Sequence, residues 1–170
     1  IETKPKISAG GTKSIDASGL VVAPGFIDMH VHLREPGQED KETIATGARA
    51  AARGGFTSIA CMPNTHPVND NRGVTEYILS EAKKNAAVNV FPIASITKEE
   101  KGEELTDMAD LIDAGAVAFS DDGMPVQNSQ VMRRDLEYSK ILDTVIIDHC
   151  EDKNLSADGV MHEGYYSYLF

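Results

Sequence analysis

The sequence has no tryptophan, few other aromatic residues and only two cysteines among its 170 residues. Cys61 and Cys150 are too few for the disulfide framework of a small secreted domain. Each ends an apolar run, so we expect both to be small buried hydrophobic side chains in a reduced, cytoplasmic protein. No apolar stretch approaches the roughly 20 residues of a transmembrane helix. We therefore expect no membrane span and no membrane partner.

Positive charge is also scarce. The chain has 16 lysine and arginine residues against 27 aspartate and glutamate residues, for a formal net charge of -11. No basic patch with interleaved aromatic residues is visible. This balance argues against nucleic acid or an anionic membrane as the main partner. The length is sufficient for one domain with a substantial hydrophobic core.

From residue 25 onward, apolar strand-like runs alternate with helix-like segments. The strand-like runs are 26–32, 56–61, 88–95, 115–120 and 144–149, and the helix-like segments are 40–53, 73–86, 103–114 and 129–142. A repeat of roughly 30 residues in this pattern predicts βαβ units in a parallel sheet. No dinucleotide-binding glycine fingerprint follows the first run, which disfavours a Rossmann fold. We therefore expect an α/β fold, a TIM-like (β/α)8 barrel of which this chain supplies about the first five strands.

The beginning of the chain differs in composition from the rest. Lysine, serine, threonine and glycine dominate residues 1–24, and 15–22 has the pattern of a strand, a turn and a strand. We predict that 1–24 is part of a small β-sandwich element, and that 25–170 is the N-terminal portion of the barrel.

Polar residues of the kinds that bind metals or carboxylates follow four of the five predicted strands. His30 and His32 share one face at the end of the first run, because side chains alternate along a strand. The others are Arg34, Asn64, the stretch Asp121-Asp122-Gly123 and the stretch Asp148-His149-Cys150-Glu151. The carboxyl ends of barrel strands meet at one rim, so three histidines and a carboxylate predict a site for one or two metal ions.

Each of these residues also has a purely structural interpretation. Asp-Gly pairs are common in turns, His149 could be a hydrogen-bonded core residue, Asn64 could shape a loop, and Arg34 could be a solvated surface charge. The recurrence at four strand ends favours a metal-dependent hydrolase over four separate coincidences.

These motifs resemble a known family. The stretch from Pro24 to Arg34 is similar to the first-strand signature of the amidohydrolase superfamily. Four further motifs are similar to class I, bacterial-type dihydroorotase: Glu35-Pro36-Gly37, Met62-Pro63-Asn64-Thr65, Phe119-Ser120-Asp121-Asp122-Gly123 and Asp148-His149-Cys150-Glu151. The resemblance extends from about residue 15 to the end of the chain.

The resemblance implies a zinc site with one or two ions. His30 and His32 would hold the more buried zinc, Asp122 would bridge, and His149 would bind the second ion. Asp122 is preferred to its neighbour Asp121 because the family's spacing to the later histidine matches Asp122. His32, Arg34 and Asn64 would bind the substrate, the last two at its carboxylate.

The implied reaction is the reversible cyclisation of N-carbamoyl-L-aspartate to dihydroorotate in pyrimidine biosynthesis. Two alternatives are another cyclic amidase, similar to hydantoinase or allantoinase, and a non-catalytic dihydroorotase-like scaffold subunit. Hydantoinases and allantoinases typically carry a carbamylated lysine as the bridge, and this sequence has no lysine near 117–125. Every ligand position within the chain is filled, which favours an enzyme over a scaffold.

The resemblance also implies features outside this sequence. The family's further histidine ligand and its catalytic aspartate, the general acid–base, follow later strands, so we expect both beyond Phe170. No catalytic residue is therefore assigned within the chain, and we expect residues 1–170 to be inactive when expressed alone. The implied partners are the small-molecule substrate, further copies of the protein in a homo-oligomer, and aspartate carbamoyltransferase.

Overall fold

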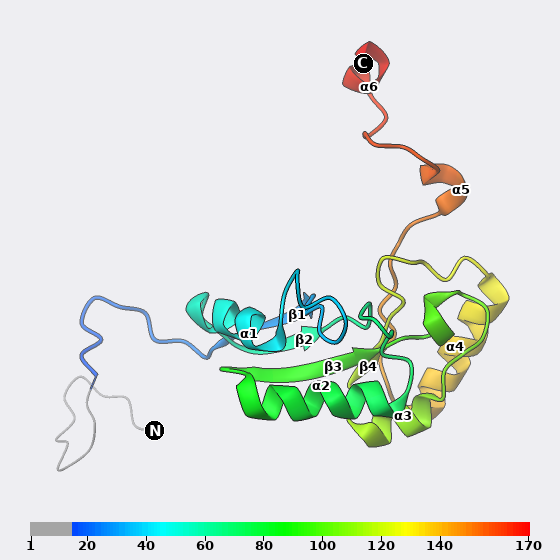
Figure 1. The fold of residues 1–170 in the computed structure, drawn as a ribbon. Coiled ribbons are helices and arrows are strands. Elements are labelled where there is room, and N and C mark those ends of the chain that lie inside the picture. The colour runs from blue at the N-terminus through cyan, green and yellow to red at the C-terminus, as the bar shows by residue number, and fades with distance from the viewer. Residues whose placement is uncertain (1–14) are drawn as a thin grey trace.

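A four-stranded parallel sheet forms the centre of the computed structural model, which describes residues 15–170. Its strands lie in chain order and are β1 (Phe26–Val31), β2 (Phe56–Cys61), β3 (Asn89–Ala94) and β4 (Ala118–Phe119). Between them lie α1 (Ile44–Arg53), α2 (Arg72–Asn85), the 3-10 turn η1 (Lys98–Glu100) and α3 (Met108–Ala114); α4 (Ser129–Leu142) follows (Figure 1). Parallel strands in sequential order with intervening helices are the repeating unit of a (β/α) barrel. The predicted partial barrel is confirmed.

The helices begin where the sequence provides capping side chains. α1 to α4 each follow a residue whose side chain accepts a hydrogen bond from a backbone N–H of the first turn, namely Thr43, Asn71, Asp107 and Asn128. α3 ends at Gly115, whose φ of +111° lies in the left-handed region that glycine adopts without strain.

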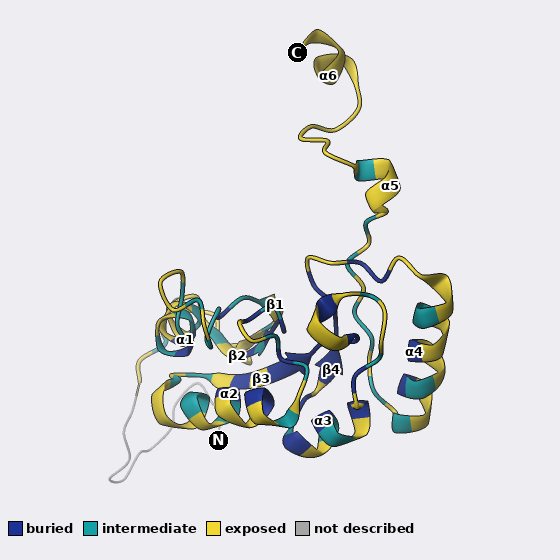
Figure 2. Ribbon diagram, turned by 45° about the vertical axis from the view of Figure 1, so that its right-hand side comes forward, coloured by how far each residue is buried: buried dark blue, intermediate teal, exposed yellow. Residues whose placement is uncertain are grey.

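The hydrophobic core lies between the sheet and the helices. It includes a completely or almost completely buried residue from most elements: Ile44, Ile59, Ile78, Leu111 and Phe119. Figure 2 shows the buried residues gathered along β3, β4 and the facing sides of the helices. This packing fixes the strand ends relative to one another, and the polar side chains that follow the strands are held by it.

The prediction of a fifth strand at 144–149 is wrong. Residues 144–149 make only an isolated parallel bridge between Ile146 and Phe119, with a hydrogen bond of 2.8 Å from the Ile147 N–H to the Phe119 carbonyl. The segment does run beside β4 in the expected direction. β4 itself spans only 118–119 rather than the predicted 115–120.

Two other local expectations need correction, and one is confirmed. α3 begins at Met108 rather than near residue 103, because the preceding residues form an antiparallel bridge between Thr97 and Leu105. Cys61 is buried as predicted, and burial raises the pKa of its thiol to about 12. Cys150 is exposed rather than buried as predicted.

The two ends of the described chain stand apart from the sheet. A turn forms at Ser18-Gly19, but 15–25 contains no strand, and the rest of the predicted β element, 1–14, lies outside the described residues. The division of the chain at residue 24 stays a prediction. At the other end, α5 (Lys153–Ser156) and α6 (Tyr165–Leu169) are largely exposed (Figures 1 and 2).

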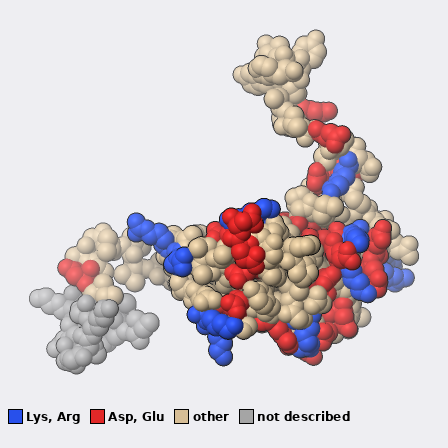
Figure 3. Space-filling model, in the orientation of Figure 1, with Lys and Arg blue, Asp and Glu red and all other residues tan. Residues whose placement is uncertain are grey.

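Acidic and basic side chains are interspersed on the surface. On the face shown in Figure 3, lysine and arginine lie among the more numerous aspartate and glutamate residues. Within 15–170, no helix is both long and apolar enough to cross a bilayer.

Candidate metal centre

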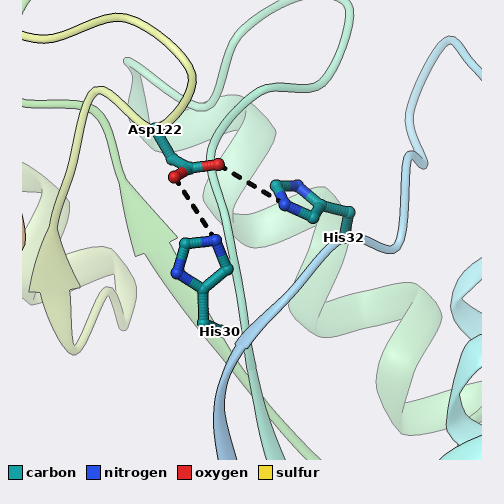
Figure 4. A group of neighbouring side chains, drawn as sticks. All are labelled: His30, His32 and Asp122. Atoms are coloured by element: carbon teal, nitrogen blue, oxygen red, sulfur yellow. Dashed lines mark ion pairs between the residues drawn. The ribbon is translucent and has the colours of Figure 1, made fainter. Parts of the chain in front are cut away.

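Two imidazole rings lie at the carboxyl end of β1. His30 is part of the strand and His32 directly follows it, so both rings project to the same side of the sheet (Figure 4). The ring centroids are 5.3 Å apart, and the rings meet edge to face at 70°. This is the shared face that the alternation of strand residues predicts.

The carboxylate of Asp122 lies between the two histidines. Asp122 belongs to the loop after β4, and the curvature of the sheet brings that loop to the end of β1. Its Oδ1 is 3.3 Å from His30 Nε2, and its Oδ2 is 3.4 Å from His32 Nε2 (Figure 4). One ligand-type atom from each of these residues lies within 4.8 Å of the others. The carboxylate is almost fully buried, whereas half of the His30 side chain is accessible.

His149 reaches the same carboxylate from the segment beyond β4. Its Nδ1 is 3.6 Å from Asp122 Oδ1, and its Nε2 is 3.4 Å from Glu151 Oε2. The other Glu151 oxygen accepts a hydrogen bond of 2.6 Å from the Ser156 hydroxyl, which lowers the pKa of Glu151. One Asp122 oxygen thus faces both His30 and His149.

Asn64 orients the ring of His32. The amide oxygen of Asn64 lies 2.9 Å from His32 Nδ1, and an amide oxygen only accepts hydrogen bonds. Nδ1 therefore carries a proton, and in the neutral ring Nε2 presents its lone pair toward Asp122. The Asn64 amide nitrogen donates to the Asp122 carbonyl at 3.5 Å, so this side chain contacts both elements of the site.

Arg34 begins the loop that follows His32. Its φ of +61° lies in the left-handed region, its side chain is half-buried, and its guanidinium makes no hydrogen bond or ion pair with another described residue. The loop is joined to the Asn64 loop by hydrogen bonds from the His66 N–H to the Pro36 carbonyl at 2.9 Å and from the Gln38 side chain to the Asn64 carbonyl at 3.1 Å. The structure therefore brings the loops of both predicted substrate-binding residues together.

Sequence reasoning missed the role of Asp121. This carboxylate is buried, and both of its oxygens accept hydrogen bonds from Thr97, one from the backbone N–H at 3.0 Å and one from the hydroxyl. Burial raises the pKa of Asp121, and the Thr97 hydrogen bonds oppose that shift. Because Asp121 and Asp122 direct their carboxylates to different partners, only Asp122 faces the histidines. Nothing in the sequence around Thr97 signals this contact.

Comparison with known proteins identifies the family to which this chain belongs. A family model described as "Dihydro-orotase-like" matches residues 19–170. The chain belongs to the dihydroorotase-like family. The resemblance in the sequence motifs is thereby confirmed.

Individual members of this family are similar along nearly the whole chain. The dihydroorotase of Pelotomaculum thermopropionicum is 63% identical over 161 residues, which are 95% of this chain and 38% of that protein. The dihydroorotase of Solibacter usitatus is 61% identical over 160 residues, or 94% of this chain and 37% of that protein. The chain thus spans little more than a third of the length of these relatives.

A solved structure supports the fold assignment. The L-hydantoinase (dihydropyrimidinase) from Arthrobacter aurescens superposes with a TM-score of 0.74 over 89% of this chain and 36% of the hydantoinase, at 22% sequence identity. At this identity the likeness establishes the shared fold alone.

Proposed function

We propose that this chain supplies the zinc-binding part of the active site of a dihydroorotase, which interconverts N-carbamoyl-L-aspartate and dihydroorotate. Relatives about 60% identical that are named dihydroorotases support this reaction. The single observation that carries the metal assignment is the placement of the Asp122 carboxylate against the Nε2 atoms of His30 and His32.

That placement favours a cation between the groups. In the neutral tautomer whose Nδ1 donates to Asn64, His32 Nε2 has no proton, so its lone pair faces a carboxylate oxygen that also has only lone pairs. Two such atoms at 3.4 Å repel each other unless a positive charge lies between them. Two ligands about 2.0–2.1 Å from one tetrahedral zinc are roughly 3.3 Å apart, which matches the separations of 3.3 and 3.4 Å at Asp122.

The ligand set suits zinc. Imidazole nitrogens and a carboxylate oxygen are common zinc ligands. In the proposal, His30, His32 and Asp122 hold one ion, and His149 with Asp122 holds a second where two are bound. Zinc bound here would lower the pKa of a water molecule and polarise the amide carbonyl of the ring.

The chain's own residues have two further tasks in this proposal. Asn64 keeps the proton on Nδ1 of His32, which leaves Nε2 free for the metal. Arg34, whose guanidinium has no partner among the described residues, binds the substrate carboxylate through its planar fork. The cytoplasmic location, the homo-oligomer and the pairing with aspartate carbamoyltransferase belong to the same proposal and rest on the family resemblance.

Metal analysis of the full-length protein tests this proposal. We expect zinc in the purified protein, and loss of both zinc and carbamoyl-aspartate cyclisation in the His30→Ala/His32→Ala double variant. His66→Ala is the matched control, because His66 is exposed and none of its ring atoms belongs to the site. Equal zinc content in the double variant and the control would contradict the ligand assignment. Faster turnover of hydantoin than of dihydroorotate by the unmutated protein would instead identify a different cyclic amidase.

A further inference from the structure

A buried contact between the ends of β3 and β4 lies directly beside the proposed ligand Asp122. Thr97 and Asp121 are both almost completely inaccessible. The Thr97 hydroxyl accepts a hydrogen bond of 2.8 Å from the Gly102 N–H, and therefore its own proton is directed to Asp121 Oδ2. The second Asp121 oxygen accepts from the Thr97 N–H.

This contact fixes the backbone from which Asp122 projects. The Ser120 N–H donates to the Ala94 carbonyl at 2.9 Å, and the Met124 N–H donates to the Asp121 carbonyl at 2.7 Å. The loop after β4 is thus tied on one side to β3 and closed on the other by a turn. With both its oxygens bound to Thr97, Asp121 cannot rotate toward the histidines without losing two hydrogen bonds in a buried environment.

Thr97 is itself held in place by its own loop. It forms a bridge with Leu105, and the N–H of the next residue, Lys98, donates to the Glu104 carbonyl at 2.8 Å. The N–H and hydroxyl groups of Thr97, which donate to the Asp121 carboxylate, are therefore held in place by contacts that do not involve a metal. A supporting group that is rigid on its own is what a metal-ligating carboxylate requires.

We propose that Thr97 and Asp121 are a positioning pair: they hold the loop after β4 so that the Asp122 carboxylate stays between His30 and His32. This inference rests on the proposed zinc site. In this proposal, Asp121 orients its neighbour Asp122. Thr97 contributes to metal affinity, although Thr97 itself does not touch the metal ligands.

Zinc affinity measured by chelator competition on the full-length protein tests the pair. Thr97→Val keeps the shape and the backbone N–H but removes the hydroxyl, and we expect zinc binding weakened about 10–100-fold, with a fall in kcat rather than a rise in KM. Thr97→Ser restores the hydroxyl and should return the affinity close to that of the unmutated protein. The matched control is Thr75→Val, because Thr75 is equally buried and also donates to a side-chain oxygen, that of Asn69 at 2.7 Å.

The comparison with the control separates positioning from general stability. Both valine variants should lower the thermal midpoint, but only Thr97→Val should weaken zinc binding. Equal zinc affinity in Thr97→Val and Thr75→Val would overturn the inference while leaving the zinc site intact. No zinc in the unmutated protein would instead overturn the proposed function, and the inference with it.

A second variant keeps the test decisive if Thr97→Val does not fold. Asp121→Asn replaces one acceptor by an NH2 group that faces the Thr97 hydroxyl, and it should also weaken zinc binding at least tenfold. If both single variants fold, the Thr97→Val/Asp121→Asn double variant should lose little more affinity than the more affected single variant, because the two residues act as one unit. Unchanged affinity in Asp121→Asn would refute the pair.

Discussion

At the scale of single residues, the hydrogen bond between Asn64 and His32 determines which ring nitrogen is free for a metal. The family resemblance gives Asn64 a substrate role, and the geometry gives it a second task, the orientation of His32. The two tasks require different chemistry. Orientation needs only an oxygen that accepts from Nδ1, whereas binding a substrate carboxylate needs the amide NH2 group.

Two substitutions at Asn64 separate these tasks. Asn64→Asp keeps the acceptor for His32 but places a negative charge near the substrate carboxylate, so we expect near-normal zinc affinity and a KM for dihydroorotate raised at least tenfold. Asn64→Leu removes the acceptor as well, and zinc affinity should fall about tenfold or more. Chelator competition and steady-state kinetics measure the two effects. If Asn64→Leu bound zinc normally, Asn64 would not control the proton on His32.

Asp135 on α4 is a carboxylate without a partner. It is fully buried, and neither oxygen has a hydrogen-bond partner among the described residues. Burial, with added repulsion from Asp121 and Asp148, raises the pKa of Asp135 to about 7. The unfolded chain loses this proton near pH 4 and the folded chain only near pH 7, so stability falls as pH rises between these values.

Removing this titration should flatten the pH dependence of stability. The shift predicts a loss of about 3 kcal/mol between pH 5 and pH 8, which Asp135→Asn should largely abolish. A slope of similar size should remain, because burial raises the pKa of Glu100 to about 8 and this carboxyl titrates over the same pH range. Thermal midpoints of the full-length protein at the two pH values check this. Glu137→Gln on the exposed side of α4 is the control: its carboxylate pKa is lowered by Arg133 and Arg134, so it should not alter the slope. The same slope in Asp135→Asn as in the control would contradict the assignment.

At the scale of elements, two loops meet so closely that one position excludes any side chain. Gly37 has a φ of +89°, and a Cβ added there would lie 1.7 Å from the His66 carbonyl oxygen. The contact joins the loop that begins at Arg34 to the loop that carries Asn64. Displacing one loop therefore moves Arg34 and Asn64 relative to the two histidines.

Gly37→Ala should consequently reduce activity more than its backbone strain alone would. Gly19 offers a matched control, since it also has a positive φ, +77°, but a Cβ added there would have no atom within 4 Å. In both alanine variants the left-handed backbone costs about 1–2 kcal/mol. We expect kcat/KM to fall more than tenfold in Gly37→Ala and less than about threefold in Gly19→Ala. Similar kinetics in the two variants would show that the loop contact does not position the site.

Features that depend on neighbouring residues in the chain could be predicted from the sequence, whereas contacts between distant residues could not. The shared face of His30 and His32 follows from strand alternation, and the helix starts follow from local caps, so both are readable in the sequence. The bond between Thr97 and Asp121 joins residues 24 positions apart and leaves no periodic signal. The segment 144–149 has the composition of a strand, but strand formation also depends on pairing with a neighbour, and this segment makes a single bridge to Phe119.

At the scale of the whole molecule, the sheet has apolar side chains that nothing in the described structure covers. Phe26, Ile27 and Met29 on β1 are 60–71% exposed, and β1 pairs with β2 on one edge only. At the other side, Val145 is also largely exposed. An open parallel sheet with apolar faces and an unpaired edge favours association with other chains.

We therefore expect residues 1–170, expressed alone, to aggregate and to show no carbamoyl-aspartate cyclisation. In the proposed function this chain supplies no general acid–base, and losing such a group typically costs about 10²–10⁴ in rate. The matched control joins this chain to the part of the Pelotomaculum thermopropionicum dihydroorotase that it does not match, at the equivalent position. Size-exclusion chromatography and a cyclisation assay should then show a discrete, active species, because new strands cover β1 and complete the site. A monomeric, active protein from the 170 residues alone would mean that the fold closes, and the reaction proceeds, without any further strand.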